Sequence, residues 1–184
     1  MPISHLVPQA PRFLVATDTY KLGMGGFWVP TTLVPVATPF AWQHQWPSTI
    51  SHHLLSDTNP SGNLTNSNLE LPALIIGHSV QLHNTMPRDY AITCIATNNT
   101  PTQAWVYNGS TTSTQAPAFL LNLLAHKCHH WKRSVLPIYM PGSTNTVAMI
   151  CCLARFIFTD HTTRSHALLP HAPWQTPSIT ILHL

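Results

Sequence analysis

Two acidic residues stand where a chain could assemble a site for a divalent cation. Asp18 ends a short apolar run, and Glu70 follows Ser67 by three residues at the start of a helical pattern. The chain has only five acidic residues, so the placement of these two is informative. Carboxylates are hard oxygen ligands of the kind that Mg²⁺ prefers. The alternative is that both are surface acids at the ends of elements, with Glu70 only capping its helix.

A second group of residues could hold zinc. His126 and His130 are four positions apart, so on a helix they share one face and could share one metal ion. A third ligand would have to come from Cys151, Cys152 or His161. The alternative is a histidine-rich helix end, where imidazolium groups complement the helix dipole. A chain with 13 histidines contains such clusters by chance, so we favour the alternative and expect no zinc.

The one basic cluster in the sequence could contact nucleic acid. Lys127, Lys132 and Arg133 could neutralise phosphates, and Trp131 could stack on a sugar or a base. The alternative is a solvated helix end. We favour that alternative, because nucleic-acid-binding domains usually carry more Lys and Arg than this chain does.

Composition indicates one globular domain of low charge. A chain of 184 residues with 44% apolar residues can bury a core, and only 7% of the residues are charged, against the usual ~25%. This composition excludes the highly charged type of disorder. The formal net charge of +3 becomes more positive near pH 6, since free histidine titrates at a pKa of ~6.5.

The sequence also predicts an intracellular protein, cytoplasmic or nuclear. The first 17 residues lack the basic start of a secretory signal and contain three prolines. The longest apolar run, residues 147–154, stops at Arg155, far short of the ~20 residues that span a membrane. The four cysteines do not form a disulfide framework, so we expect reduced thiols and no membrane partner.

The elements that must position Asp18 and Glu70 alternate between strands and helices. Apolar patterns and turn residues predict four strands, at residues 12–17, 27–29, 48–55 and 91–96, and a fifth at 135–139. A glycine turn is expected at residues 23–26 and an irregular loop over residues 30–46. Helices are predicted at residues 69–83, from about residue 100, at 116–131 and at 146–158. The plan is an α/β domain with a mixed sheet.

Proline-rich segments set the expected domain limits. We predict an entry segment over residues 1–11, one folded domain over residues 12–158, and a weakly structured tail rich in Pro and His over residues 159–184.

Four sequence blocks in order resemble the ribonuclease H-like region that follows the reverse transcriptase in retroelement polyproteins. Asp18 with the glycines at 23, 25 and 26 is similar to the first aspartate and its hairpin. Residues 64–71, LTNSNLEL, are similar to the family's TNSDLEL pattern. Residues 98–112 are similar to DNTxxxAWxxKGSTT, and residues 141–148 to the start of PGxxNxxAD. The resemblance covers about residues 13–155.

This resemblance implies a fold, an activity and a cofactor. The fold is a five-stranded mixed sheet flanked by helices, and the activity is cleavage of RNA in RNA–DNA hybrids. The implied cofactor is a pair of Mg²⁺ or Mn²⁺ ions held by clustered carboxylates, of which Asp18 and Glu70 would be two. The implied partners are the hybrid and a reverse transcriptase domain.

The chain departs from the family at the remaining acids. The third acid falls at Asn98, a neutral and weak ligand, and the fourth falls at Met149, or at Ile150 with a shift of one residue. Pro72 also interrupts the predicted helix, at a cost of ~3 kcal/mol. We therefore predict a degenerate, catalytically impaired site made of Asp18, Glu70, Asn98 and Met149. The alternatives are a non-catalytic module that binds nucleic acid or a neighbouring polymerase through residues 127–133, and a decayed fragment.

Overall fold

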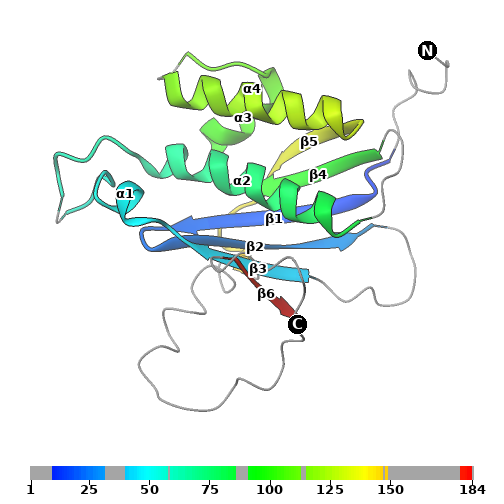
Figure 1. Ribbon diagram of the computed structural model, residues 1–184, viewed down its shortest axis with the longest axis horizontal. Coiled ribbons are helices and arrows are strands. Elements are labelled where there is room, and N and C mark those ends of the chain that lie inside the picture. Colours follow the sequence, from blue (N-terminus) through cyan, green and yellow to red (C-terminus); the bar gives the residue numbers. More distant parts are fainter. Residues whose placement is uncertain are drawn as a thin grey trace.

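The computed structural model has a mixed six-stranded sheet with helices packed on it (Figure 1). It describes residues 10–31, 40–57, 59–85, 91–112, 115–146, 148 and the backbone of 179–183. The strands are β1 (Phe13–Tyr20), β2 (Gly23–Pro30), β3 (Phe40–Gln45), β4 (Ala91–Thr97), β5 (Arg133–Tyr139) and β6 (Ile179–His183). The helices are α1 (Ser48–Ser51), α2 (Asn66–His83), α3 (Thr100–Asn108) and α4 (Gln115–His130).

The strand order is β5-β4-β1-β2-β3-β6. Strands β1, β2 and β3 pair antiparallel, and β1, β4 and β5 run parallel. These five strands confirm the expected five-stranded mixed sheet. Because the three parallel strands point the same way, their carboxyl ends share one edge of the sheet. The sixth strand, β6, pairs antiparallel with β3 and lies within the predicted tail. The division at residues 11 and 158 stays a prediction.

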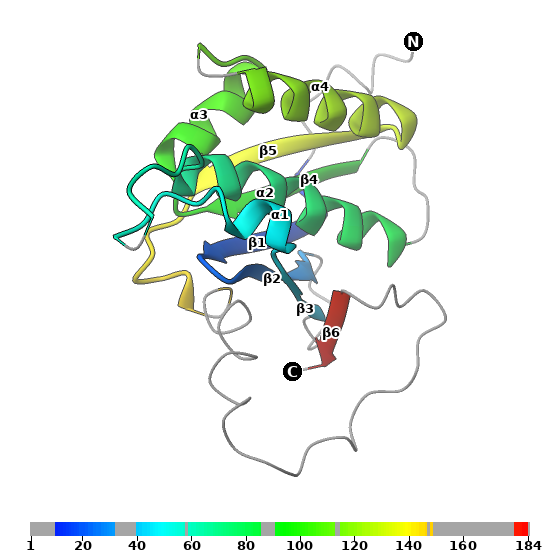
Figure 2. The same cartoon turned by 60° about the vertical axis from the view of Figure 1, so that its left-hand side comes forward.

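Helices α2, α3 and α4 lie together on one face of the sheet (Figure 2). The main core forms between this face and α2, and it includes Val15, Trp42, Leu74 and Ile95. A smaller cluster on the opposite face contains Ala16, Ala96 and Ala148. Alternate residues of β1 and β4 therefore face opposite layers, as the two-residue period of a strand requires.

Helix α2 begins earlier than the capping pattern predicted. Thr65 is the N-cap, so Ser67 and Glu70 both lie inside the helix and the predicted capping box is wrong. Pro72 lies within the helix, as predicted, and has no N–H for the carbonyl four residues earlier. The helix survives because the sheet, α3 and α4 cover it, and 11 of its 18 residues are buried.

The glycine segment is a strand and not a turn. Gly23 begins β2, and Lys21 and Leu22 make the turn after β1. A Cβ on Gly26 would lie 2.3 Å from the carbonyl oxygen of Ala16, so the paired strands approach too closely for a side chain. Gly26 is therefore needed for close packing between β1 and β2.

Two further expectations were wrong. Residues 40–45, expected in an irregular loop, form β3 against β2. Residues 48–51, expected in a third strand, form the short helix α1. The expected strands at β4 and β5 and the expected helix at α4 are confirmed within a few residues. The predicted helix over residues 146–158 lies almost entirely outside the described residues.

In the described part of the chain, no helix combines the length and the apolar character that crossing a bilayer requires.

Candidate functional site

The candidate site lies at the edge of the sheet where β1 and β4 end. Ala16 of β1 is in register with Ala96 of β4, and two residues further on stand Asp18, within β1, and Asn98, the residue that follows β4. Parallel neighbours in register bring these two side chains to the same face of the sheet. The structure therefore brings together three of the four predicted site residues, Asp18, Asn98 and Glu70. The fourth, Met149, lies outside the described residues.

Asp18 and Asn98 are joined directly. The Asn98 side-chain nitrogen donates a hydrogen bond to Oδ1 of Asp18 at 2.9 Å. Burial raises the pKa of Asp18 above its usual range, and the hydrogen bonds from Asn98 and from the backbone N–H of Thr19 partly offset that rise. The partner of this carboxylate is an amide donor.

Glu70 lies on α2 and is buried between this helix and the ends of β1 and β4. Its side chain is 0% exposed. The Thr19 hydroxyl donates to Oε1 at 2.7 Å, and the Thr97 hydroxyl donates to Oε2 at 3.4 Å. Burial is the main cause that raises the pKa of Glu70 to about 7, and the charge of Asp18 adds to it. Burial therefore favours the protonated form of this carboxyl group more than in a free Glu side chain.

Sequence reasoning missed the polar residues that hold this edge together. Asn99 caps α3 by accepting from the backbone N–H of Thr102 at 3.0 Å, and its side-chain nitrogen donates to the Ser67 hydroxyl at 3.1 Å. The Thr102 hydroxyl donates to the Ser67 carbonyl at 3.2 Å. These bonds tie the start of α3 to the start of α2. An Asn before a Thr-Pro pair is an N-cap signal that could have been recognised.

A second asparagine fixes the loop after β5. Asn145 is 2% exposed, and its side-chain nitrogen donates to the Thr17 carbonyl at 2.9 Å. The neighbouring Ala148 packs on Ala16 and Ala96. The same loop approaches the site, since a Cβ on Gly142 would lie 3.8 Å from the Asn98 side-chain nitrogen.

The donor set does not fit a pair of Mg²⁺ ions. Asn98 can offer a cation only its neutral amide oxygen, and its amide nitrogen donates to the Asp18 carboxylate. Glu70 already accepts two hydroxyl hydrogen bonds, and burial disfavours its ionised form. Two-metal chemistry needs several ionised carboxylates around the same point. The described residues instead form an amide–carboxylate pair beside a buried carboxyl group.

The predicted basic cluster lies at the opposite edge of the sheet. Arg133 begins β5 and is in register with Ala91, whereas Thr97 and Tyr139 are in register at the site edge. Six residues at ~3.3 Å each separate the two edges by ~20 Å. Lys127, Trp131, Lys132 and Arg133 therefore lie at this edge, away from Asp18 and Glu70, but the Arg133 side chain is only 5% exposed.

The histidines considered for zinc lie on an exposed helix face. His126 and His130 are both exposed on α4, and Cys151, Cys152 and His161 are outside the described residues. Within the described ranges, no three His, Cys, Asp or Glu side chains are grouped closely enough to hold a metal ion. Burial raises the pKa of the nearby Cys128 thiol to about 11, which disfavours the thiolate that zinc binds.

Comparison with known proteins finds the fold but no close sequence relative. No family model and no curated protein sequence matches the chain. Ribonuclease H1 from the halophilic archaeon Halobacterium salinarum NRC-1 superposes with a TM-score of 0.54 and 11% identity, over 79% of this chain and 96% of that one. LC11-RNase H1 in complex with an RNA/DNA hybrid superposes with a TM-score of 0.52 and 12% identity, over 79% and 99% of the two chains. At these identities the likeness establishes architecture, and this chain has a ribonuclease H-like fold.

Proposed function

We propose that this chain is a ribonuclease H-like domain of retroelement origin that binds RNA–DNA hybrids and has lost two-metal cleavage. The observation that carries the proposal is the hydrogen bond from Asn98 to Asp18 at 2.9 Å. The amide N–H donates to the carboxylate and stabilises its negative charge, as a bound cation would. The pair of side chains therefore does not need a metal ion. The four ordered sequence blocks support the retroelement origin.

The loss of cleavage follows from charge. Activating water and stabilising a leaving oxygen with two cations requires carboxylates to hold both ions close together. Burial raises the pKa of both Asp18 and Glu70, so these two side chains supply at most two negative charges, and Asn98 supplies none. Met149 cannot replace a carboxylate, because a thioether is a soft ligand.

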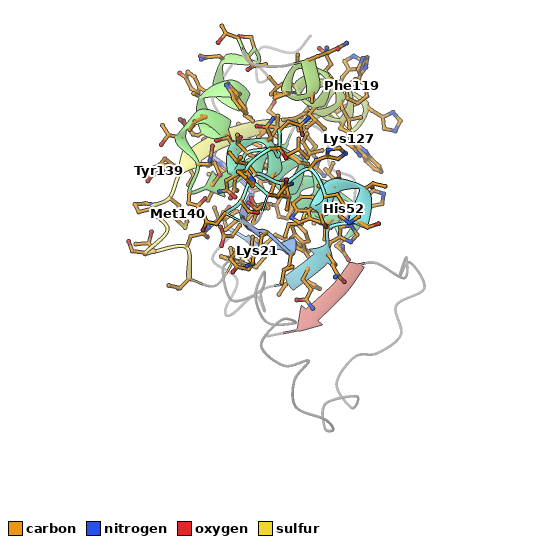
Figure 3. All side chains as sticks on the ribbon, turned by 90° about the vertical axis from the view of Figure 1, so that its left-hand side faces the viewer. Lys21, His52, Phe119, Lys127, Tyr139 and Met140 are labelled. Atoms are coloured by element: carbon orange, nitrogen blue, oxygen red, sulfur yellow. The ribbon has the colours of Figure 1, made fainter. Side chains whose placement is uncertain are left out.

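Exposed side chains at the site edge support hybrid binding. Tyr20 and Tyr139 are 41% and 52% exposed, and Lys21 lies in the turn after β1. Figure 3 views this edge and labels Lys21 and Tyr139 on it. Aromatic rings can stack on sugars or bases while a lysine contacts phosphate. The structural neighbour LC11-RNase H1, with the same fold, is known in complex with an RNA/DNA hybrid.

The test is a binding and cleavage assay on one sample. The purified chain is mixed with a labelled RNA–DNA hybrid in Mg²⁺ and in Mn²⁺, beside Asp18→Asn and Tyr139→Ala variants. We expect salt-sensitive binding without cleavage, and weaker binding for Tyr139→Ala. Cleavage by the unaltered chain that disappears in Asp18→Asn would overturn the loss of catalysis. Absence of hybrid binding by a sample that melts cooperatively would overturn the binding function.

Two other parts of the proposal have separate tests. Retroelement origin implies a reverse transcriptase domain as neighbour and partner, and sequencing the DNA upstream of this coding region tests that origin. A decayed fragment would melt broadly and without cooperativity, whereas a retained domain melts in one sharp transition.

A further inference from the structure

The charges of the described residues are segregated along α2. The acids Asp18 and Glu70 lie at its start, and Asp57 lies in the loop that leads into it. Figure 1 shows this loop and the end of β1 at the same end of the molecule. Lys21 is the one base of the described part at this end. The 13 residues from Glu70 to His83 carry the helix ~20 Å to the other edge.

The opposite edge carries the remaining bases of the described ranges. Arg133 begins β5, and Lys127 and Lys132 flank the end of α4. Arg12 precedes β1, and its backbone N–H donates to the Ile92 carbonyl at the start of β4, so it belongs to the same edge. Residues 86–90, between α2 and β4 in the sequence, lie outside the described residues.

Three rings lie beside these bases. Trp131 is half-buried, with its ring centroid 5.8 Å from that of His83 and 5.4 Å from that of His130. The His83 ring is oriented by a 2.7 Å hydrogen bond between its Nδ1 and the Ser79 carbonyl. The cluster therefore joins the last turn of α2 to the last turn of α4, with an indole held between two imidazoles.

The positive charges at this edge affect the pKa of a buried histidine. His78 is 0% exposed on α2, one turn before His83. The pKa of His78 is lowered to about 4, mainly by burial and in addition by the positive charges of Lys127 and Arg133. These charges thus act on the interior as well as on the surface of this edge.

We propose that this basic edge is a second nucleic-acid site, which binds the phosphate backbone of a single strand. It acts independently of the acid edge, the edge of the sheet that carries Asp18 and Glu70. The edge is defined by Arg12, His83, Lys127, His130, Trp131 and Lys132. Positive charges alone would suit any acidic polymer, but rings beside them suit a nucleic acid, whose bases stack while its phosphates pair with lysine. With the acids ~20 Å away, the phosphates meet little repulsion here.

The test is fluorescence anisotropy of a labelled oligo-dT strand over a range of salt concentrations. The main variant is Lys127→Gln/Lys132→Asn, where Asn suits the left-handed φ of 51° at position 132. We expect roughly tenfold weaker binding and a salt slope smaller by about 1.4, or ~0.7 for each lost phosphate contact. Trp131→Leu should weaken binding by about fivefold or more through lost stacking. Each variant is first shown to melt cooperatively.

Matched variants outside both edges keep the test specific. Phe119→Leu removes an exposed ring near the start of α4, and His52→Gln removes an exposed imidazole just after α1, so neither should change oligo-dT affinity or salt slope. An unchanged affinity in the double lysine variant would overturn the proposal, as would a loss in Phe119→Leu equal to that in Trp131→Leu. Displacement of oligo-dT by polyglutamate at equal charge concentration would instead indicate an acidic protein partner. Failure of hybrid binding at the acid edge leaves these expectations unaltered.

Discussion

The side-chain nitrogen of Asn98 donates to Oδ1 of Asp18 across the ends of β4 and β1, at 2.9 Å. The bond joins residues 80 positions apart and closes the edge where the parallel strands end. An amide donor stabilises an ionised carboxylate, as a cation would, but it cannot activate water. The pair therefore preserves the geometry of the edge without metal chemistry.

Ionisation of Glu70 should destabilise the fold. Its pKa rises from 4.5 unfolded to about 7 folded, so between these values the folded state binds more protons and the free energy of unfolding falls as pH rises. The stabilising contribution is complete below pH ~4.5 and lost through pH ~7, a difference of about 3 kcal/mol. Glu70→Gln should remove this pH-dependent fall in the free energy of unfolding. Urea unfolding at pH 5 and pH 8 measures the fall, and Asp57→Asn, at an exposed residue, is the control. If Glu70→Gln keeps the same pH dependence as the unaltered chain, the prediction is wrong.

His78 should produce the opposite slope. Its pKa falls from 6.5 to about 4 on folding, so its contribution is complete above pH ~6.5 and lost as pH falls through ~4. Between pH ~4.5 and ~6.5 the slopes of Glu70 and His78 offset each other. His78→Phe should leave a free energy of unfolding that falls steadily from pH 5 to pH 7, measured by the same urea series.

The same variant tests the buried ring at neutral pH. Both ring nitrogens of His78 lack a hydrogen-bond partner among the described residues. Replacing an unsatisfied buried polar ring by an apolar one should stabilise by about 1 kcal/mol at pH 7. A destabilisation of similar size would show that the nitrogens do have a partner.

Removing Pro72 should stabilise α2. Pro72→Ala restores an N–H that can donate to the Asn68 carbonyl, so we expect the free energy of unfolding to rise by up to ~3 kcal/mol. Thermal melting measures the gain. Pro117→Ala is the matched control, because residue 117 lies in the first turn of α4, where an N–H has no helical partner. If Pro72→Ala and Pro117→Ala raised the free energy of unfolding equally, the restored backbone hydrogen bond could not be the cause of the gain.

The long periodic segments could be predicted from sequence. The apolar spacing of α4 and the apolar runs of β4 and β5 agree with the structure, because each is buried on the face that its own period defines. Asp18 was expected just after a strand and lies in β1, two residues before its end, and Glu70 was expected at a helix start and lies in the second turn of α2. Each position was predicted to within a few residues, from where an apolar pattern stops or begins.

The errors arose where contacts with distant residues decide the structure. Strand β3 depends on its register with β2, and Gly26 is required by the nearby Ala16 carbonyl, neither of which is visible locally. Asn98 was expected to be a weak metal ligand through its oxygen. The orientation of its amide depends on Asp18, a partner that only the parallel pairing of β1 and β4 brings near.

The most direct test of the central claim is the effect of metal on the melting temperature. A bound ion stabilises the folded state by mass action, so binding appears as a rise in Tm. Asn98→Asp should be less stable than the unaltered chain without metal, since two carboxylates then face each other, and its Tm should rise in millimolar Mg²⁺ or Mn²⁺. The account predicts no such rise for the unaltered chain. A rise in the unaltered chain that disappears in Asp18→Asn would contradict it.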